Sequence, residues 1–362
     1  MTVDDYVSLF IDANLRWEAV GNIFAVAGRS LMATLVNDAL LDDGLTTRES
    51  LLSQISEAIN LCLSLCNHVS CSNELLVSLQ VNDVMLKTLQ FGDSSYQAWR
   101  RLADLSATLY YTGIHQQPSL ERESESDPAF LTQWKRGCFA AAFYVDKCLA
   151  TFFGRPPLLN YRHCNLTLPL DLSDDVLVAD AASFAESVGD LNADGWNNRG
   201  QVHRSSLARI RMLLAIFRAQ VLEITAARYD DSVSPRAYQV LEEARVTWER
   251  CPDILRYDRY DHDACVEHAS HADMFTIVSA YLDYLHSRFL LLQYLGRQAD
   301  ENNWALLGTA RQIVATIVKT ITYRMSLIDM SRDYSWIRYA ISTGIMSSTS
   351  RAPGAVDRAL TN

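Results

Sequence analysis

The sequence lacks the clustered positive charge of a protein that binds nucleic acid directly. Its 362 residues include 43 acidic and 32 basic side chains, which leaves a formal net charge of −11. No run of Lys and Arg is longer than two residues. Because binding to phosphates requires grouped Lys and Arg side chains, we expect no direct contact between this chain and nucleic acid.

Signals for secretion and for membrane insertion are also missing. The N-terminal segment MTVDDYVSLFIDANLRW has acids where a signal peptide has basic residues, and it has no continuous apolar core. No stretch is long and apolar enough to predict a bilayer span. These absences predict an intracellular protein that does not contact membranes.

Cysteines are too few for a disulfide framework. Eight occur in the chain, and in a reducing compartment they are expected to be free thiols. The segment CLSLCNHVSC holds Cys62, Cys66, Cys71 and His68, which is one candidate metal site. However, Cys62 and Cys66 fall on the apolar stripe of a predicted helix, and no C-x2-C pair is present. Buried core thiols are therefore the favoured interpretation.

Catalytic signatures are absent as well. The sequence has no G-x-S-x-G elbow, no G-x-x-x-x-G-K-S/T loop and no G-x-G-x-x-G turn. A second candidate metal site, DHDACVEHASHAD, contains Asp261, His262, Asp263, Cys265, His268, His271 and Asp273. Its spacing matches no zinc hydrolase signature, so a solvated loop is favoured. We predict no catalytic, cofactor-binding or metal-binding residue and expect no cofactor.

Two-residue alternation, the pattern of strands, is confined to HCNLTLPLDL, where Pro169 interrupts it. Apolar residues recur instead at spacings of three and four, which is typical of helices. The four clearest stripes are Leu52, Ile55, Ile59, Cys62 and Cys66; Leu131, Trp134, Cys138, Ala141, Val145, Cys148 and Phe152; Leu207, Ile210, Leu214, Phe217, Val221 and Ile224; and Leu307, Ala310, Val314, Ile317 and Ile321. They predict an all-α fold of about ten helices in a single domain over residues 1–341, followed by a polar, disordered tail over residues 342–362.

The segment from residue 127 to residue 175 predicts one long helix with an abrupt end. Asp127 can cap a helix that begins at Pro128. Gly154 can end that helix in the left-handed conformation, and the two prolines that follow cannot continue it. Arg155 is expected to tether the helix end by donating to its last carbonyls. Asp146, among apolar positions, is expected to need a partner.

Arg204, Arg211 and Arg218 repeat every seven residues beside the third stripe. Such a row can form a basic ridge for an anionic partner. More often such a row is a solvated helix shoulder or pairs with acids on a neighbouring helix, and we favour this second interpretation.

A family resemblance follows from the order of these motifs. The pattern W-K-R-x-C-F, then D-K, then G-R-P-P, followed by LPLD, resembles the middle homology region of fungal-specific transcription factors, the regulatory domain of binuclear zinc cluster proteins. NLRWEAVGNIFAVAGRSL, LCLSLC, FGDSSYQAWRRLADLSATLYYTGIHQ and DDVLVADAASFAESVGDLNADGWN resemble further segments of the family. The resemblance extends from about Asp4 to Arg338.

The resemblance implies an all-α regulatory domain and no catalysis. It implies a nuclear protein that controls transcription, often of metabolic or secondary-metabolite genes, through effectors or partner proteins. The implied partners are the transcriptional machinery or another regulator, in a homodimer or heterodimer, and a small-molecule effector. The positions that match the family's motif, expected to determine the fold, are Trp134, Arg136, Asp146, Gly154, Arg155, Pro156 and Pro169.

The sequence departs from the family in two ways. No zinc cluster is present, so DNA binding is not carried over from the resemblance. The chain also becomes polar from about Ser342, where further apolar helices are usual in the family. Two alternatives to a transcription regulator remain open at this point: an enzyme or small-molecule-binding protein that reuses the fold, and a truncated gene product.

Overall fold

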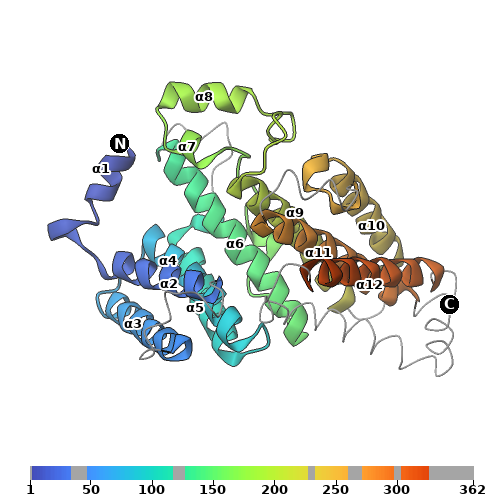
Figure 1. Ribbon diagram of the computed structural model, residues 1–362, viewed down its shortest axis with the longest axis horizontal. Coiled ribbons are helices and arrows are strands. Elements are labelled where there is room, and N and C mark those ends of the chain that lie inside the picture. Colours follow the sequence, from blue (N-terminus) through green and yellow to red (C-terminus); the bar gives the residue numbers. More distant parts are fainter. Residues whose placement is uncertain are drawn as a thin grey trace.

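The computed structural model describes residues 2–33, 47–116, 127–226, 233–259, 271–296 and 303–325. Over these residues the regular structure consists of α-helices and short 3-10 helices, and an isolated bridge between Leu191 and Asn197 is the single β-type pairing. The predicted all-α fold is confirmed (Figure 1). The predicted domain boundary and polar tail lie outside the described residues.

Twelve α-helices are described in these ranges, two of them shorter than eight residues. Their bounds are α1 Val3–Ser8, α2 Trp17–Ala33, α3 Arg48–His68, α4 Glu74–Phe91, α5 Tyr96–Thr112, α6 Ala129–Phe153, α7 Asp174–Leu177, α8 Ala181–Gly189, α9 Arg204–Ala226, α10 Val233–Glu249, α11 His271–Gly296 and α12 Asn303–Met325. None of the helices within the described ranges is both long and apolar enough to cross a membrane.

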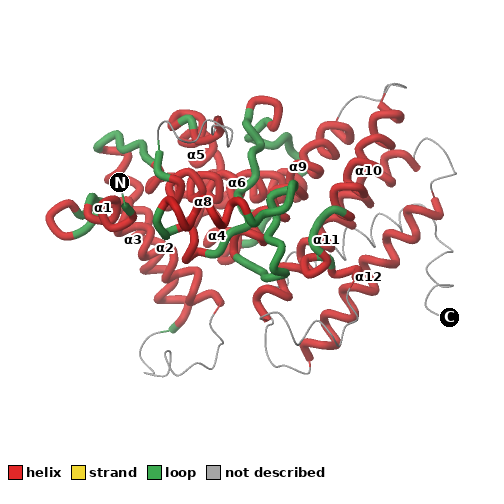
Figure 2. The backbone as a smooth tube through the Cα atoms, turned by 90° about the horizontal axis from the view of Figure 1, so that it is seen from above, coloured by secondary structure: helices red, strands yellow, loops and turns green. Residues whose placement is uncertain are grey.

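The long helix α6 runs through the middle of the molecule. Figure 1 shows α2, α3, α4 and α5 on one side of it and α9, α10, α11 and α12 on the other. The view from above in Figure 2 shows α10, α11 and α12 together at the end of the molecule far from α1. The two groups of helices therefore meet through α6.

Three apolar cores follow from this arrangement. One joins α2, α3 and α4; a second joins α4, α5, α6 and α9; a third joins α9, α10, α11 and α12. Because α4 and α9 each contribute to two cores, they bury more than one face. The predicted stripes on α3 and α9 are confirmed, since their members are buried except for Leu207, which is partly buried.

The predicted stripe on α6 identifies only part of its buried surface. Trp134, Cys138, Val145 and similar stripe members are half-buried, whereas the deepest side chains include charged ones on other faces. Among the most deeply buried side chains are Arg136 and Lys147, each 1% exposed. The difference arises because α6 packs against α4, α5 and α9 at once, so neighbours cover most of its circumference.

The predicted N-terminal cap of α6 is wrong, whereas its predicted C-terminal end is confirmed. Pro128 occupies the N-cap position, and Asp127 instead accepts a hydrogen bond from Lys135 Nζ at 2.7 Å. At the other end, Gly154 is left-handed with φ of 59°, and its N–H reaches the carbonyls of the last turn. The glycine therefore ends the helix as predicted.

The predicted stripe on α12 is only partly confirmed. Ile317 is buried and Ala310 packs against the same core, whereas Leu307 is 57% exposed and Val314 is 48% exposed. The other buried positions of this face are Thr309, Ile313, Thr316 and Thr320. The hydroxyl of Thr309 donates to the Ala305 carbonyl at 2.9 Å, which satisfies the hydroxyl inside the helix. Threonine can therefore face the core, and hydrophobicity alone does not identify this face.

Candidate functional site

The loop that follows α6, residues 154–159, is held in place by two adjacent buried charges of that helix, Asp146 and Lys147. Asp146 accepts hydrogen bonds from the backbone N–H groups of Leu158 at 2.8 Å and Leu159 at 3.1 Å. Lys147 Nζ pairs with Asp146 Oδ2 and donates to the Leu159 carbonyl at 2.6 Å. The expectation that Asp146 needs a partner is thus met by the next residue in the chain. These hydrogen bonds fix the backbone that follows the two prolines.

Arg155 does not have the tethering contact expected from the sequence. Its side chain is exposed, and its backbone N–H, rather than its guanidinium, donates to the Ala150 carbonyl at 3.1 Å. The helix end is instead held from inside by the Asp146–Lys147 pair. Burial lowers the pKa of Lys147, and the adjacent Asp146 carboxylate opposes this effect.

The LPLD segment is held by a second group of buried hydrogen bonds at the start of α9. Asp171 is 1% exposed and accepts hydrogen bonds from the backbone N–H of Asn197 at 3.0 Å and from the Ser206 hydroxyl. Arg209 donates to the Pro169 carbonyl at 2.5 Å and lies over the Trp196 ring. These contacts hold the LPLD segment against the start of α9.

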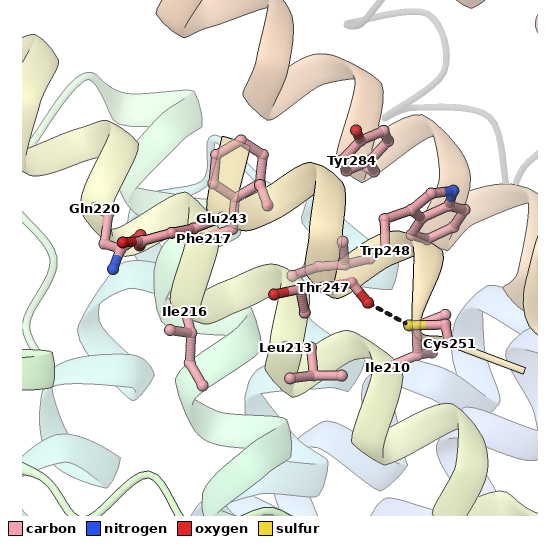
Figure 3. A pocket seen from close by; sticks show the side chains of 12 residues that line it. Ile210, Leu213, Ile216, Phe217, Gln220, Glu243, Thr247, Trp248, Cys251 and Tyr284 are labelled. Carbon is pink, nitrogen blue, oxygen red and sulfur yellow. Dashed lines mark hydrogen bonds between the residues drawn. The ribbon is translucent and has the colours of Figure 1, made fainter. Parts of the chain in front are cut away.

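A hollow of about 160 Å³ opens between α9, α10 and α11. Its walls are largely apolar, as Figure 3 shows: Ile210 and Phe217 come from α9, Trp248 from α10 and Tyr284 from α11. The Trp248 ring stacks on the Tyr284 ring with centroids 4.9 Å apart and planes at 9°. The stacked rings form one aromatic wall of the hollow.

The mouth of this hollow is polar. Gln220 of α9 and Glu243 and Thr247 of α10 line it, and the latter two are exposed. Cys251 at its base donates to the Thr247 carbonyl (Figure 3). Burial raises the pKa of Cys251 to about 12, so its thiol is protonated at neutral pH and is a poor nucleophile. The arrangement suits binding rather than covalent chemistry.

A second hollow, of about 230 Å³, lies among α3, α4 and α5 and is polar. Asp83 is fully buried there and pairs with Lys87 at 3.7 Å and Arg101 at 3.0 Å. Burial raises the pKa of Asp83, while the two cations act in the opposite direction. Because opposite charges already meet in this hollow, it suits an apolar ligand less well than the aromatic one, although its volume is larger.

The candidate residues from the sequence do not gather at either hollow as a set. Cys62 and Cys66 are buried in the core of α2, α3 and α4, as the core-thiol interpretation predicts, and His68 is exposed. The side chains of the histidine-rich group, Asp261 to Asp273, lie outside the described residues.

The arginine row does not form a ridge. Arg204 is exposed and lies 3.7 Å from Asp174, whereas Arg218 is 6% exposed and lies 3.9 Å from Asp283 of α11. Arg211 lies over the Tyr144 ring. Because these three side chains do not share one exposed surface, a binding site for an anionic partner is not built from them. Pairing with acids is confirmed for Arg204 and Arg218, whereas the buried Arg218 does not belong to a solvated shoulder.

One protein family matches a stretch of the chain that contains the end of α6, the LPLD segment and the first half of α9. The model of the fungal specific transcription factor domain matches residues 55–215. Over these residues the chain is similar to a fungal specific transcription factor domain. No curated protein and no solved structure matches the chain significantly.

The match confirms the resemblance over residues 55–215. Outside these residues the resemblance stays an expectation. NLRWEAVGNIFAVAGRSL lies before the matched residues, and α10, α11 and α12 lie after them. The family is one of regulatory domains rather than enzymes, and it indicates regulation of the transcription-factor type. The aromatic hollow lies on the border of the match, since α9 begins inside it and α10 follows it.

Sequence reasoning missed the aromatic hollow. Trp248 and Tyr284 are 36 positions apart in the sequence, and no motif links them. The periodic placement of Ala244 and Trp248, one turn apart on α10, was the available signal for that helix's buried face. It does not reveal which residues of α9 and α11 stand opposite.

Proposed function

We propose that this protein regulates transcription in the nucleus and that its helical domain responds to a small cyclic molecule. The ligand would bind in the aromatic hollow between α9, α10 and α11. The matched domain supports the regulatory part of the proposal. The volume of about 160 Å³ and the stacked walls support the ligand class, because an apolar cavity near 150 Å³ is large enough for a benzene-sized molecule.

The polar mouth suggests one further property of the ligand. Gln220, Glu243 and Thr247 offer hydrogen-bonding groups at one side of an otherwise apolar space. A ring that carries a single hydroxyl or amino group would place its apolar part against Trp248 and its polar group toward Glu243. This combination of an apolar pocket with a few polar groups is typical of small-molecule sites.

The position of the hollow suggests how binding could reach the rest of the domain. Helix α9 lines the hollow with one face and packs against α6 with another, where Met212, Ala215 and Ala219 join the second core. A ligand that binds one arrangement of α9 and α10 more tightly than another would shift the population of the whole domain. The proposed readout is contact with the transcriptional machinery or another regulator at metabolic genes.

A reporter experiment tests the regulatory role. The full chain is fused to an unrelated DNA-binding domain, and transcription from the matching reporter is measured in fungal cells. We expect the fusion to change reporter activity relative to the DNA-binding domain alone. Reporter activity equal to that of the DNA-binding domain alone would contradict the proposal. The unfused protein should not retain DNA specifically in a binding assay.

A matched pair of variants tests the site. Thr247→Trp fills the mouth of the hollow, while Val246→Trp places the same ring on the neighbouring exposed position of α10, outside the lining. Phenol and benzylamine serve as probes, and binding is followed by ligand-observed NMR. We expect Thr247→Trp to weaken binding about tenfold or more and Val246→Trp to leave it unchanged. Equal effects of the two variants would contradict the site.

A further inference from the structure

Two thiols and a carboxylate converge where α2, α3 and α4 meet. The Sγ atoms of Cys66 and Cys71 and a carboxylate oxygen of Glu18 all lie within 4.8 Å of one another. Glu18 lies in the first turn of α2, Cys66 near the end of α3, and Cys71 in the turn that leads to α4. Three elements of the fold therefore supply one potential ligand each.

We propose that this group binds a zinc ion through the Cys66 and Cys71 thiolates and the Glu18 carboxylate. In a tetrahedral zinc site with such ligands, the ligand atoms stand about 3.6 to 3.8 Å apart, as the metal–ligand bond lengths require. The separations are at most 4.8 Å, and the distance from Cys66 Sγ to Glu18 Oε2 is already 3.8 Å, so small side-chain rotations need to shorten the other separations by no more than about 1 Å. Soft thiolate ligands favour zinc over magnesium or calcium.

The Glu18 carboxylate is the observation that favours a cation over a disulfide between the two cysteines. Glu18 is 3% exposed, and its two oxygens accept hydrogen bonds from Asn73 Nδ2 at 2.7 Å and Cys66 Sγ at 3.8 Å. A disulfide would remove the thiol donor and leave the buried carboxylate beside two sulfurs. Arg16, 3.8 Å from Glu18, compensates only the charge of this carboxylate, whereas a metal ion would also compensate the charges of two thiolates bound beside it.

The surrounding residues provide a second layer of support and an entry path. Asn73 caps α4 through its side-chain oxygen and holds Glu18 through its side-chain nitrogen; such outer contacts orient metal ligands. Cys71 is half-buried, so an ion can enter from solvent and a water can occupy the fourth position. Arg16 lies 3.8 Å from Glu18 and is half exposed. Two thiolates and a carboxylate would balance zinc together with Arg16.

Zinc binding at this group should release protons. An ordinary thiol carries its proton at neutral pH, whereas zinc binds the thiolate. Two S–H bonds would break as two Zn–S bonds form, and the two protons would pass to the solvent. The affinity should therefore fall as pH is lowered. Zinc that binds only the folded chain would also raise its melting temperature.

Titration of the reduced, chelator-treated full chain with zinc chloride tests the site, with a chromophoric chelator as competitor. We expect one zinc per chain. Cobalt(II) in place of zinc should give a thiolate-to-cobalt charge-transfer absorption. Calorimetry in buffers of different ionisation enthalpy should show release of up to two protons.

Three variants make the experiment decisive. Glu18→Gln and Cys71→Ser should each weaken zinc binding tenfold or more. Cys164→Ser, which changes another half-buried thiol, should not weaken binding. Circular dichroism checks that each variant is folded.

Three results would overturn the assignment. The first is no zinc retention by the wild type. The second is equal zinc affinity of the wild type, Glu18→Gln and Cys71→Ser. The third is an unreduced protein whose mass shows a Cys66–Cys71 disulfide and whose reduced form binds no zinc. The test is independent of the aromatic hollow, because Thr247→Trp should leave zinc binding unchanged.

Discussion

At the scale of single residues, the most informative groups are two buried charges in the last turns of α6. Asp146 and Lys147 are 0% and 1% exposed, yet each has a partner of opposite charge and hydrogen bonds to the loop at residues 158 and 159. A buried charge that loses its partner costs far more than an exposed one. The sequence indicates that Asp146 needs a partner, but it does not indicate that Lys147 bends back to supply it.

Replacement of Asp146 should therefore destabilise the protein strongly. Asp146→Ala leaves the Lys147 ammonium buried and two backbone N–H groups without acceptors, which should cost about 3 to 5 kcal/mol of unfolding free energy. Arg155→Ala removes an exposed side chain and should change it by about 0.5 kcal/mol or less. Urea denaturation measures both values. If Arg155→Ala lowered the unfolding free energy as much as Asp146→Ala does, Arg155 would hold the helix end as the sequence predicts.

At the scale of elements, helix packing depends on where one backbone approaches another. A Cβ atom added at Gly21 of α2 would lie 2.6 Å from Leu79 Cδ2 and 3.1 Å from Cys62 Cβ. A Cβ at Gly28, seven positions later, would lie 2.9 Å from Leu86 Cδ2 and 3.0 Å from Ile55 Cγ2. These two glycines therefore allow α2 to lie close against both α3 and α4.

A pair of glycine substitutions separates close packing from helix propensity. Gly21→Ala should lower the free energy of unfolding by about 1 to 2 kcal/mol, because overpacking outweighs the better helix propensity of alanine. Gly137→Ala in α6, where a Cβ would contact nothing within 4 Å, should raise it by about 0.5 to 1 kcal/mol. Denaturant titrations of both variants supply the comparison. If both substitutions stabilise the protein, α2 packs less closely than described.

At the scale of the whole molecule, a polar network links α6, α9 and α11. Tyr144 donates to Asp283 at 2.5 Å, and Arg218 donates to Ser287 at 2.6 Å and to the Asp283 carbonyl at 3.1 Å. Asp93, in the turn between α4 and α5, is influenced by the charge of Asp283. The two groups of helices therefore interact through charge as well as through the apolar cores.

This network predicts a pH-dependent stability. Burial, followed by the charge of Asp283, raises the pKa of Asp93 to about 6 from its ordinary 3.8. The folded state thus binds the Asp93 proton more tightly than the unfolded state, and its carboxylate destabilises the fold as pH rises from about 4 to about 6. Asp93→Asn should stabilise the protein above pH 6 by roughly 1 to 3 kcal/mol, and the gain should vanish near pH 4.

Melting temperatures of the wild type and Asp93→Asn across this pH range provide the measurement. Glu57→Gln, which removes one negative charge from the exposed side of α3, controls for net charge. A gain for Asp93→Asn that is the same at pH 4 and pH 7 would show that ionisation of Asp93 is not its cause.

The sequence by itself determined the helical class, the stripes on α3 and α9, the glycine end of α6 and the family resemblance of residues 55–215. These features depend on local spacing, which a linear sequence displays. Only the tertiary structure decided which faces of α6 and α12 are buried, because neighbours cover several faces of α6 and threonines satisfy their hydroxyls within α12. It alone brought Glu18 to Cys66 and Trp248 to Tyr284, since residues far apart in sequence meet only when the helices pack.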